Sequence, residues 1–180
     1  MHTVKSEQRR MFRVSIMVLI ILLTVGCDQG TKALARSRLG QGNVVFLLGG
    51  VLVMRYVENQ GAFLSLGAWL PPPARRALFI AFPVVILGAL IVYVARKKDI
   101  RVLLGAGFSL VAGGGIGNLL DRILHNGRVG DFLNVGLGSL RTGIFNVADL
   151  CIMLGCLLLI IDSARGNRPP FLLDPGRRRQ

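Results

Sequence analysis

Two short segments of this chain repeat the same pairing of an amide and a carboxylate side chain. Asn118 and Asp121 are three residues apart, and so are Asn146 and Asp149. Residues three apart lie on one face of an α-helix, so each segment would present its amide and its carboxylate together. Acidic residues are scarce, at 9 of 180 positions, and their placement therefore carries information about function.

Two carboxylates close together in a medium of low dielectric constant cannot both ionise easily, so the pair holds one proton between them. Such a pair can hydrolyse a peptide bond, because the ionised aspartate takes a proton from water while the protonated one polarises the scissile carbonyl. Asp131, in the segment Val-Gly-Asp-Phe, is a third candidate. Spacing alone leaves alternatives open, since Asp121 could form an ion pair with Arg122 and Asp131 could be an ordinary loop residue.

The composition places these residues in a membrane protein. The chain has 22 Lys and Arg against 9 Asp and Glu and a formal charge of +13, yet 52% of its residues are hydrophobic and its mean hydropathy is +0.58. The hydrophobicity excludes a disordered chain, and a domain of this size cannot bury so much apolar surface from water. We therefore expect an α-helical membrane protein with its positive charge gathered on one side, and no nucleic-acid partner.

Four apolar segments approach or reach the 20 or so residues that a helix needs to cross a bilayer. The predicted spans cover about 12–27, 77–95, 102–120 and 144–161 of a single membrane domain, 1–180. Asp149 then lies about five residues inside the last span, roughly 7 Å below its start. The run from Gly113 to Gly117 lacks the Lys-Ser/Thr of a phosphate loop, so we expect it to let helices pack closely.

The basic residues orient the spans. Thirteen of the 22 occur in the N-terminal tail, in the loop between the second and third spans, and in the C-terminal tail, which four spans place on one side. The positive-inside rule makes that side cytoplasmic, so both termini are expected in the cytoplasm and loops 28–76 and 121–143 outside. The three clusters are Lys5, Arg9, Arg10 and Arg13; Arg96, Lys97, Lys98 and Arg101; and Arg165, Arg168, Arg177, Arg178 and Arg179.

The first outer loop contains a predicted β-hairpin. Residues 43–59 form two apolar, β-branched runs on either side of Gly49-Gly50, a pair that favours a tight turn. Each run is too short to span a bilayer as a helix. We therefore expect a small extracytoplasmic, β-rich subdomain lying on the outer membrane surface, ended by Pro71-Pro72-Pro73 before the second span.

Five short motifs occur in order along the chain. They are Asp28-Gln29-Gly30-Thr31-Lys32; Asn59-Gln60-Gly61-Ala62, with Ser65 shortly after; GGGIGNLLDR from Gly113 to Arg122; VGDF from Val129 to Phe132; and FNVAD from Phe145 to Asp149. Together they resemble the lipoprotein signal peptidase (signal peptidase II) family of bacterial intramembrane aspartic proteases. Each motif is weak alone, but five in order on a four-span chain are specific, and the resemblance covers nearly the whole chain.

The resemblance implies that Asp131 and Asp149 are the catalytic pair and that no metal or cofactor takes part. It implies an enzyme of the bacterial inner membrane that cuts the signal peptide from prolipoproteins before a Cys already carrying diacylglycerol. Its site would lie near the outer face, in contact with membrane lipid, and a globomycin-type inhibitor is expected to block it. Supporting or substrate-binding roles are implied for Asn59, Asn118, Asp121, Arg122, Asn146, Asp28 and Lys32.

Two departures from the family pattern affect local loops: Thr142-Gly143-Ile144 stands where the family often has a proline, and Phe63 follows the second motif directly. Two other functions stay open. A small transporter would couple protons through Asp149 but should carry that acid near the bilayer centre, and an assembly factor would use the acids as structural ion pairs only. Gly26-Cys27 also resembles a weak lipobox, although Thr24 is a poor residue there and further spans follow.

Overall fold

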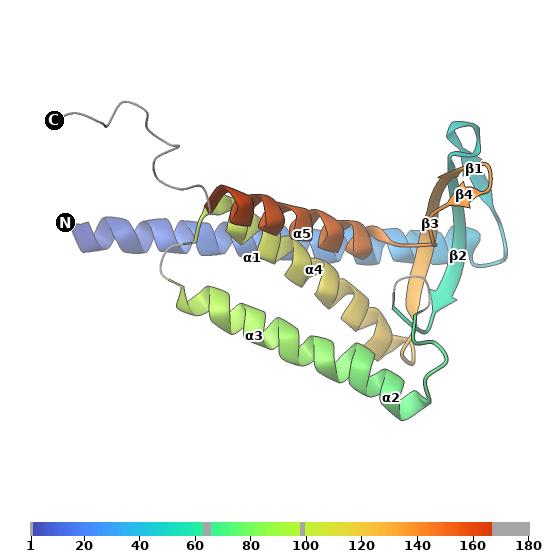
Figure 1. Ribbon diagram of the computed structural model, residues 1–180, viewed down its shortest axis with the longest axis horizontal. Helices are drawn as coiled ribbons and strands as arrows, with labels where there is room; N and C mark the ends of the chain where they lie inside the picture. The colour runs from blue at the N-terminus through green and yellow to red at the C-terminus, as the bar shows by residue number, and fades with distance from the viewer. Residues whose placement is uncertain (1, 63–65, 98–99, 167–180) are drawn as a thin grey trace.

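The computed structural model describes residues 2–62, 66–97 and 100–166, so the predictions that involve Phe63, Ser65, Lys98 or the basic residues beyond 166 lie outside the described residues. Long helices form a bundle with a small sheet across one end, and the N-terminus lies at the other end (Figure 1). The elements are α1 (His2–Leu39), β1 (Val45–Leu47), the 3₁₀ turn η1 (Leu48–Gly50), β2 (Leu52–Asn59), α2 (Pro72–Arg76), the π-helical turn η3 (Ala77–Ala81), α3 (Phe82–Arg96), α4 (Val102–Leu124), β3 (Val129–Leu137), β4 (Leu140–Arg141) and α5 (Val147–Gly166).

Four helical segments of the described chain are long and apolar enough to cross a membrane, which confirms the predicted architecture. They run over Arg10–Leu39, Pro72–Val94, Val102–Leu124 and Val147–Arg165. Large apolar side chains on them, including Leu22, Phe82, Val85, Met153 and Ile160, are more than half exposed. Exposed apolar surface on this scale is typical of helices that contact lipid.

Helix α1 continues to Leu39, well beyond the predicted end of the first span near residue 27. A buried stripe with helical spacing explains the extension, because Asp28, Lys32, Ala35 and Leu39 are each 5% exposed or less. Ala35 and Leu39 form an apolar cluster with Phe132 of β3. The second half of α1 is therefore held by protein contacts, and its Asp28 and Lys32 lie inside the molecule, whereas Arg36 and Arg38 are exposed.

The described sheet has the strand order β1-β2-β3-β4, with antiparallel neighbours. The predicted hairpin is present as β1 and β2, and Gly49 and Gly50 of its turn have φ values of 64° and 88°, which favour glycine. The sequence placed β structure in the first long loop alone, whereas β3 and β4 come from the second. Pairing between β2 and β3 joins the two loops, and it brings Val57 opposite Asp131.

The glycine run of α4 lies where α1, α4 and α5 meet. A Cβ at Gly113 would lie 2.7 Å from the Thr24 Cβ, and one at Gly114 would lie 2.5 Å from the Ala148 carbonyl oxygen. Both distances are shorter than normal contacts, so glycine is required for the helices to approach this closely. The predicted packing role of the run is confirmed, and the run holds together the helix ends that carry the polar residues.

Candidate active site

Strand β3 holds Asp131 in a buried position, with 3% of the residue exposed. Each carboxylate oxygen accepts one N–H group: Oδ1 from Asn146 Nδ2 at 2.6 Å and Oδ2 from Asn59 Nδ2 at 2.9 Å. Asn59 is the last residue of β2, and its Oδ1 accepts the backbone N–H of Gly61 at 2.8 Å. That bond fixes the direction of the Asn59 amide, so an N–H group faces Asp131.

The sequence predicted that Asp149 lies about five residues inside the last helix. In the structure Asp149 lies in the first turn of α5 instead. Helix α5 begins at Val147 because Asn146 caps it. The Asp149 N–H donates to Asn146 Oδ1 at 3.0 Å, and the Asn146 N–H donates to Asp149 Oδ2 at 3.2 Å. This reciprocal pair has the form of a capping box. It brings the partly exposed Asp149 to the sheet end of the bundle.

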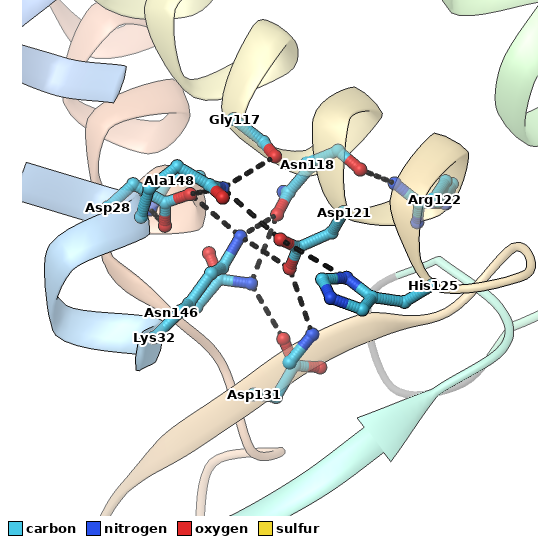
Figure 2. A network of polar contacts seen from close by, with 12 residues as sticks. Asp28, Lys32, Gly117, Asn118, Asp121, Arg122, His125, Asp131, Asn146 and Ala148 are labelled. Atoms are coloured by element: carbon cyan, nitrogen blue, oxygen red, sulfur yellow. Dashed lines mark hydrogen bonds and ion pairs between the residues drawn. The ribbon is translucent and has the colours of Figure 1, made fainter. Parts of the chain in front are cut away.

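Two asparagines connect the aspartates, and Figure 2 shows their side chains above Asp131. Asn118 Nδ2 donates to Asp149 Oδ1 at 2.9 Å, while Asn146 Nδ2 donates to Asp131. Asn146 Nδ2 also donates to Asn118 Oδ1 at 3.1 Å, which joins the two amides. The two Asn/Asp segments noticed in the sequence thus meet in space. Asp121 is not part of this bridge.

The surroundings of Asp131 make it easier to protonate than an ordinary aspartate. Burial raises the pKa of Asp131 to about 6, and the negative charge of Asp149 acts in the same direction. The hydrogen bonds from Asn59 and Asn146 and the charge of Lys32 lower this pKa without offsetting the burial. The charge of Asp149 therefore helps Asp131 to hold a proton.

A buried ion cluster lies beside the bridge (Figure 2). Lys32 Nζ lies 2.7 Å from Asp28 Oδ2, 3.1 Å from Asp121 Oδ2 and 2.9 Å from Asn118 Oδ1. Asp28 also accepts the backbone N–H of Ala148 at 2.9 Å, and Asp121 accepts a backbone N–H of β3 at 3.0 Å. The cluster therefore connects α1, α4, α5 and β3 around the bridge.

Arg122 does not form the ion pair with Asp121 that the sequence left open. Its guanidinium donates to the carbonyl oxygens of Gly61 at 2.9 Å and Asn118 at 3.2 Å, and it lies 5.6 Å from the centre of the Phe79 ring. Asp121 turns toward α1 instead and binds its lysine. Arg122 therefore ties the loop after β2 to α4 and brings a positive charge to the two aspartates.

Two polar side chains of the site carried no sequence signal. Gln29 Nε2 lies 3.2 Å from both Asp28 Oδ2 and Asp121 Oδ1, to which it donates. His125 Nε2 lies 2.7 Å from Arg36 Nη1, and its Nδ1 lies 4.0 Å from Asp121 Oδ1. Gln29 stands at an unspecified position of its motif and His125 lies outside every motif, so only the three-dimensional packing identifies them.

These features define a class of protein: a polytopic membrane protein in which asparagine side chains link two carboxylates at one end of the helix bundle. Comparison with known proteins gives the family. The sequence profile of the signal peptidase (SPase) II family matches residues 20–165. This chain therefore belongs to the signal peptidase II family.

Relatives and solved structures agree with that assignment. The lipoprotein signal peptidase of Geobacillus thermodenitrificans is 31% identical over 150 residues, which cover 83% of this chain and 90% of that protein. The lipoprotein signal peptidase of Brucella ovis is 36% identical over 149 residues, which cover 83% of this chain and 89% of that protein. A bacterial membrane enzyme solved at 2.3 Å resolution shares the fold, with a TM-score of 0.74 and 23% identity over 93% of this chain and 94% of that one. A second bacterial membrane enzyme, solved at 1.9 Å resolution, has a TM-score of 0.71 and 27% identity, and the match covers 83% of this chain and 93% of that one.

Proposed function

We propose that this enzyme removes signal peptides from diacylglyceryl-modified prolipoproteins, cutting before the lipidated Cys, with Asp131 and Asp149 as its catalytic pair. Membership of the signal peptidase II family supports the reaction and the prolipoprotein substrate. The observation that carries the residue assignment is the link between the two carboxylates through the amides of Asn118 and Asn146. The reaction needs such a pair.

The chemistry that we propose is general acid–base hydrolysis with one shared proton. The ionised carboxylate takes a proton from the attacking water, the protonated one polarises the scissile carbonyl, and the proton then passes to the leaving amine. The burial that raises the pKa of Asp131 to about 6 supports this scheme, because it makes Asp131 easier to protonate than an ordinary carboxyl group. Each oxygen of the two carboxylates accepts a single N–H from the described residues, which leaves a lone pair for water or substrate.

Arg122 is suited to hold the peptide beside this pair. Its Nε is buried and has no hydrogen-bond partner among the described residues. A buried donor without an acceptor is costly, and a carbonyl of the bound substrate would satisfy it. Asn59 holds Asp131 and also donates to the Ala62 carbonyl at 3.0 Å, so it would support the catalytic residue and the adjacent loop together.

The lipid part of the substrate needs an apolar surface. A groove between α1, α3 and α4 has an almost wholly apolar lining that includes Val14, Ile21, Leu90 and Phe108. It lies within the predicted bilayer, below the level of the aspartates, where an acyl chain or the signal helix would be buried. We place the enzyme in the bacterial inner membrane, with the termini cytoplasmic and the site near the outer face.

Cleavage of a lipidated prolipoprotein by the purified enzyme in lipid nanodiscs tests the assignment. Asp131→Asn and Asp149→Asn should each lower kcat by roughly 10²–10⁴-fold, the usual contribution of a general acid or base. Glu58→Gln is the matched control. Glu58 is an exposed acid of β2, and its carboxylate forms an ion pair with Arg128 at 2.8 Å. Removing the Glu58 charge should therefore leave kcat near the wild-type value.

A near wild-type rate in either aspartate variant, correctly inserted, would exclude that residue from catalysis. A chain that is a transporter or an assembly factor would cleave nothing under any condition. Inhibition of the wild-type enzyme by globomycin is a quicker first measurement, and we expect it.

A further inference from the structure

We propose that Lys32 is a positioning residue, whose ammonium group fixes the direction of the Asn118 amide and, through it, that of the Asn146 amide. Both aspartates of the proposed pair then face N–H donors. The inference rests on the proposed function, because it assigns Lys32 a role relative to Asp131 and Asp149. It goes beyond bracing of α1, which an ion pair with Asp28 would provide without any contact to an amide.

The Lys32 ammonium group is buried, and each of its three N–H donors has an acceptor. The residue is 5% exposed, and its Nζ has three donors for three acceptors: Asp28 Oδ2 at 2.7 Å, Asn118 Oδ1 at 2.9 Å and Asp121 Oδ2 at 3.1 Å. An ammonium group has donors only. The group that it contacts on Asn118 must therefore be the carbonyl oxygen and not the NH₂.

An asparagine side-chain amide can flip with little change in shape, and the flip exchanges the positions of its oxygen and nitrogen. With Oδ1 held toward Lys32, Asn118 Nδ2 points at Asp149 Oδ1, 2.9 Å away. The turned amide would set an NH₂ group against an ammonium and a carbonyl against a carboxylate. Both contacts would be repulsive in a site of low dielectric constant, so the lysine charge selects one orientation.

The second amide follows from the first. Asn118 Oδ1 also accepts from Asn146 Nδ2 at 3.1 Å, and the same Nδ2 donates to Asp131 Oδ1 at 2.6 Å. Asn146 Oδ1 in turn accepts the backbone N–H of Asp149 at 3.0 Å. The Lys32 ammonium thus sets the orientation of the Asn118 amide, and Asn118 sets that of Asn146. As a result, both aspartates accept N–H donors within one hydrogen-bond network that joins α1, α4, α5 and β3.

Replacing Lys32 by methionine keeps an unbranched side chain, one atom shorter, and removes the three donors of Nζ. We expect Lys32→Met to lower kcat by about 100-fold, the scale of effect that a small misplacement of catalytic groups produces, with a much smaller change in KM. The pH optimum should also rise, since the Lys32 charge lowers the pKa of Asp131. Asp149 and Arg122, the other charged side chains that act on Asp131, are unchanged in this variant.

Arg101→Met is the matched control. Arg101 Nη2 lies 2.7 Å from Oδ2 of the buried Asp162, and this ion pair joins the start of α4 to the far part of α5, away from the site. Both variants deprive a buried aspartate of its cation. If Lys32 had only that structural role, the two variants would show the same loss of folded protein with an unchanged pH optimum, and the proposal would be wrong.

A double-mutant cycle tests the route through Asn118. If Lys32 acts through that amide, Lys32→Met should lower kcat by less than about 3-fold in an Asn118→Leu background, because the amide to be directed is already gone. Effects on kcat that multiply would show that Lys32 acts by another route. If Lys32→Met does not fold, the charge-balanced pair Asp28→Asn/Lys32→Met replaces it, with the same expected loss of kcat and the same double-mutant cycle, measured against Asp28→Asn alone.

The same assay separates the two proposals. Activity in Asp131→Asn or Asp149→Asn would overturn both of them. Inactive aspartate variants together with a normal kcat and pH optimum in Lys32→Met would overturn only the role of Lys32.

Discussion

Asp131 is a carboxyl group that the folded protein keeps at a pKa of about 6, against 3.8 for the ordinary group, chiefly because it is buried. The folded state therefore holds this proton more tightly than the unfolded chain does. The resulting stabilisation is present below about pH 4 and is lost as the pH rises to about 6. A difference of about two pKa units corresponds to about 3 kcal/mol, so ionisation at neutral pH has a measurable cost.

This cost predicts a specific difference between wild type and Asp131→Asn. Asparagine has no carboxyl group to ionise, so the Tm of the variant relative to wild type should increase as the pH rises from 4 to about 6 and then level off. Thermal unfolding in one detergent across this range measures the difference. A Tm difference that does not change with pH would mean that Asp131 keeps an ordinary pKa in the folded protein.

The residue-level predictions were only partly accessible from the sequence. Spacing identified the Asn118/Asp121 and Asn146/Asp149 pairs, but it could not say that Asp121 would turn toward Lys32 while Asp131 joined the bridge. That choice depends on β3, which supplies Asp131 from another element. The assignment of Asp131 and Asp149 came from motif resemblance, and no spacing rule would have supplied it.

Among the elements, α4 carries Asn118 and α5 is capped by Asn146, so the distance between these helices controls the site. Gly114→Ala tests this. Its Cβ would lie 2.5 Å from the Ala148 carbonyl oxygen and 2.8 Å from Ile152 Cγ1, and overpacking of this kind typically costs 1–3 kcal/mol. The helices must move apart, which lengthens the Asn118–Asn146 hydrogen bond. We expect both Tm and kcat to fall.

Gly88→Ala provides the comparison. Gly88 lies in α3, and a Cβ there would meet no atom within 4 Å. Alanine should be tolerated or slightly stabilising in this helix, with kcat unchanged. Equal losses of kcat in the two variants would mean that the contact between α4 and α5 does not control the site.

The lengths of the elements show where sequence patterns stop being informative. Apolar runs identified the spans, because the bilayer requires them. They gave no sign that α1 would reach Leu39, since its second half is buried against protein and carries Asp28 and Lys32. Strand β3 was missed because Asp131 occupies one of its inward positions, where alternation predicts an apolar residue. Asn146 shifted the start of α5 by capping it. The sheet and the polar cluster are therefore tertiary features.

The two ends of the molecule's long axis differ in the features that they carry. The candidate site and the sheet lie at one end, and the N-terminus and the end of α3, where Arg96 is followed by Lys97, lie at the other (Figure 1). Asp149 is in the first turn of α5, far from the bilayer centre where a proton-coupling acid of a transporter would be expected. The arrangement suits an enzyme that meets its substrate at one membrane surface.

The charge distribution then predicts the orientation. Moving a positive charge across the membrane potential costs about 2.3 kcal/mol per 100 mV, so the basic ends should stay in the cytoplasm. In a variant without its native cysteines, Glu58→Cys on the sheet should react with a membrane-impermeant maleimide in intact cells. Lys97→Cys should react only after the cells are permeabilised. Both positions are exposed, so a lack of labelling reports membrane side rather than burial. The opposite pattern would put the site on the cytoplasmic face, where translocated signal peptides could not reach it.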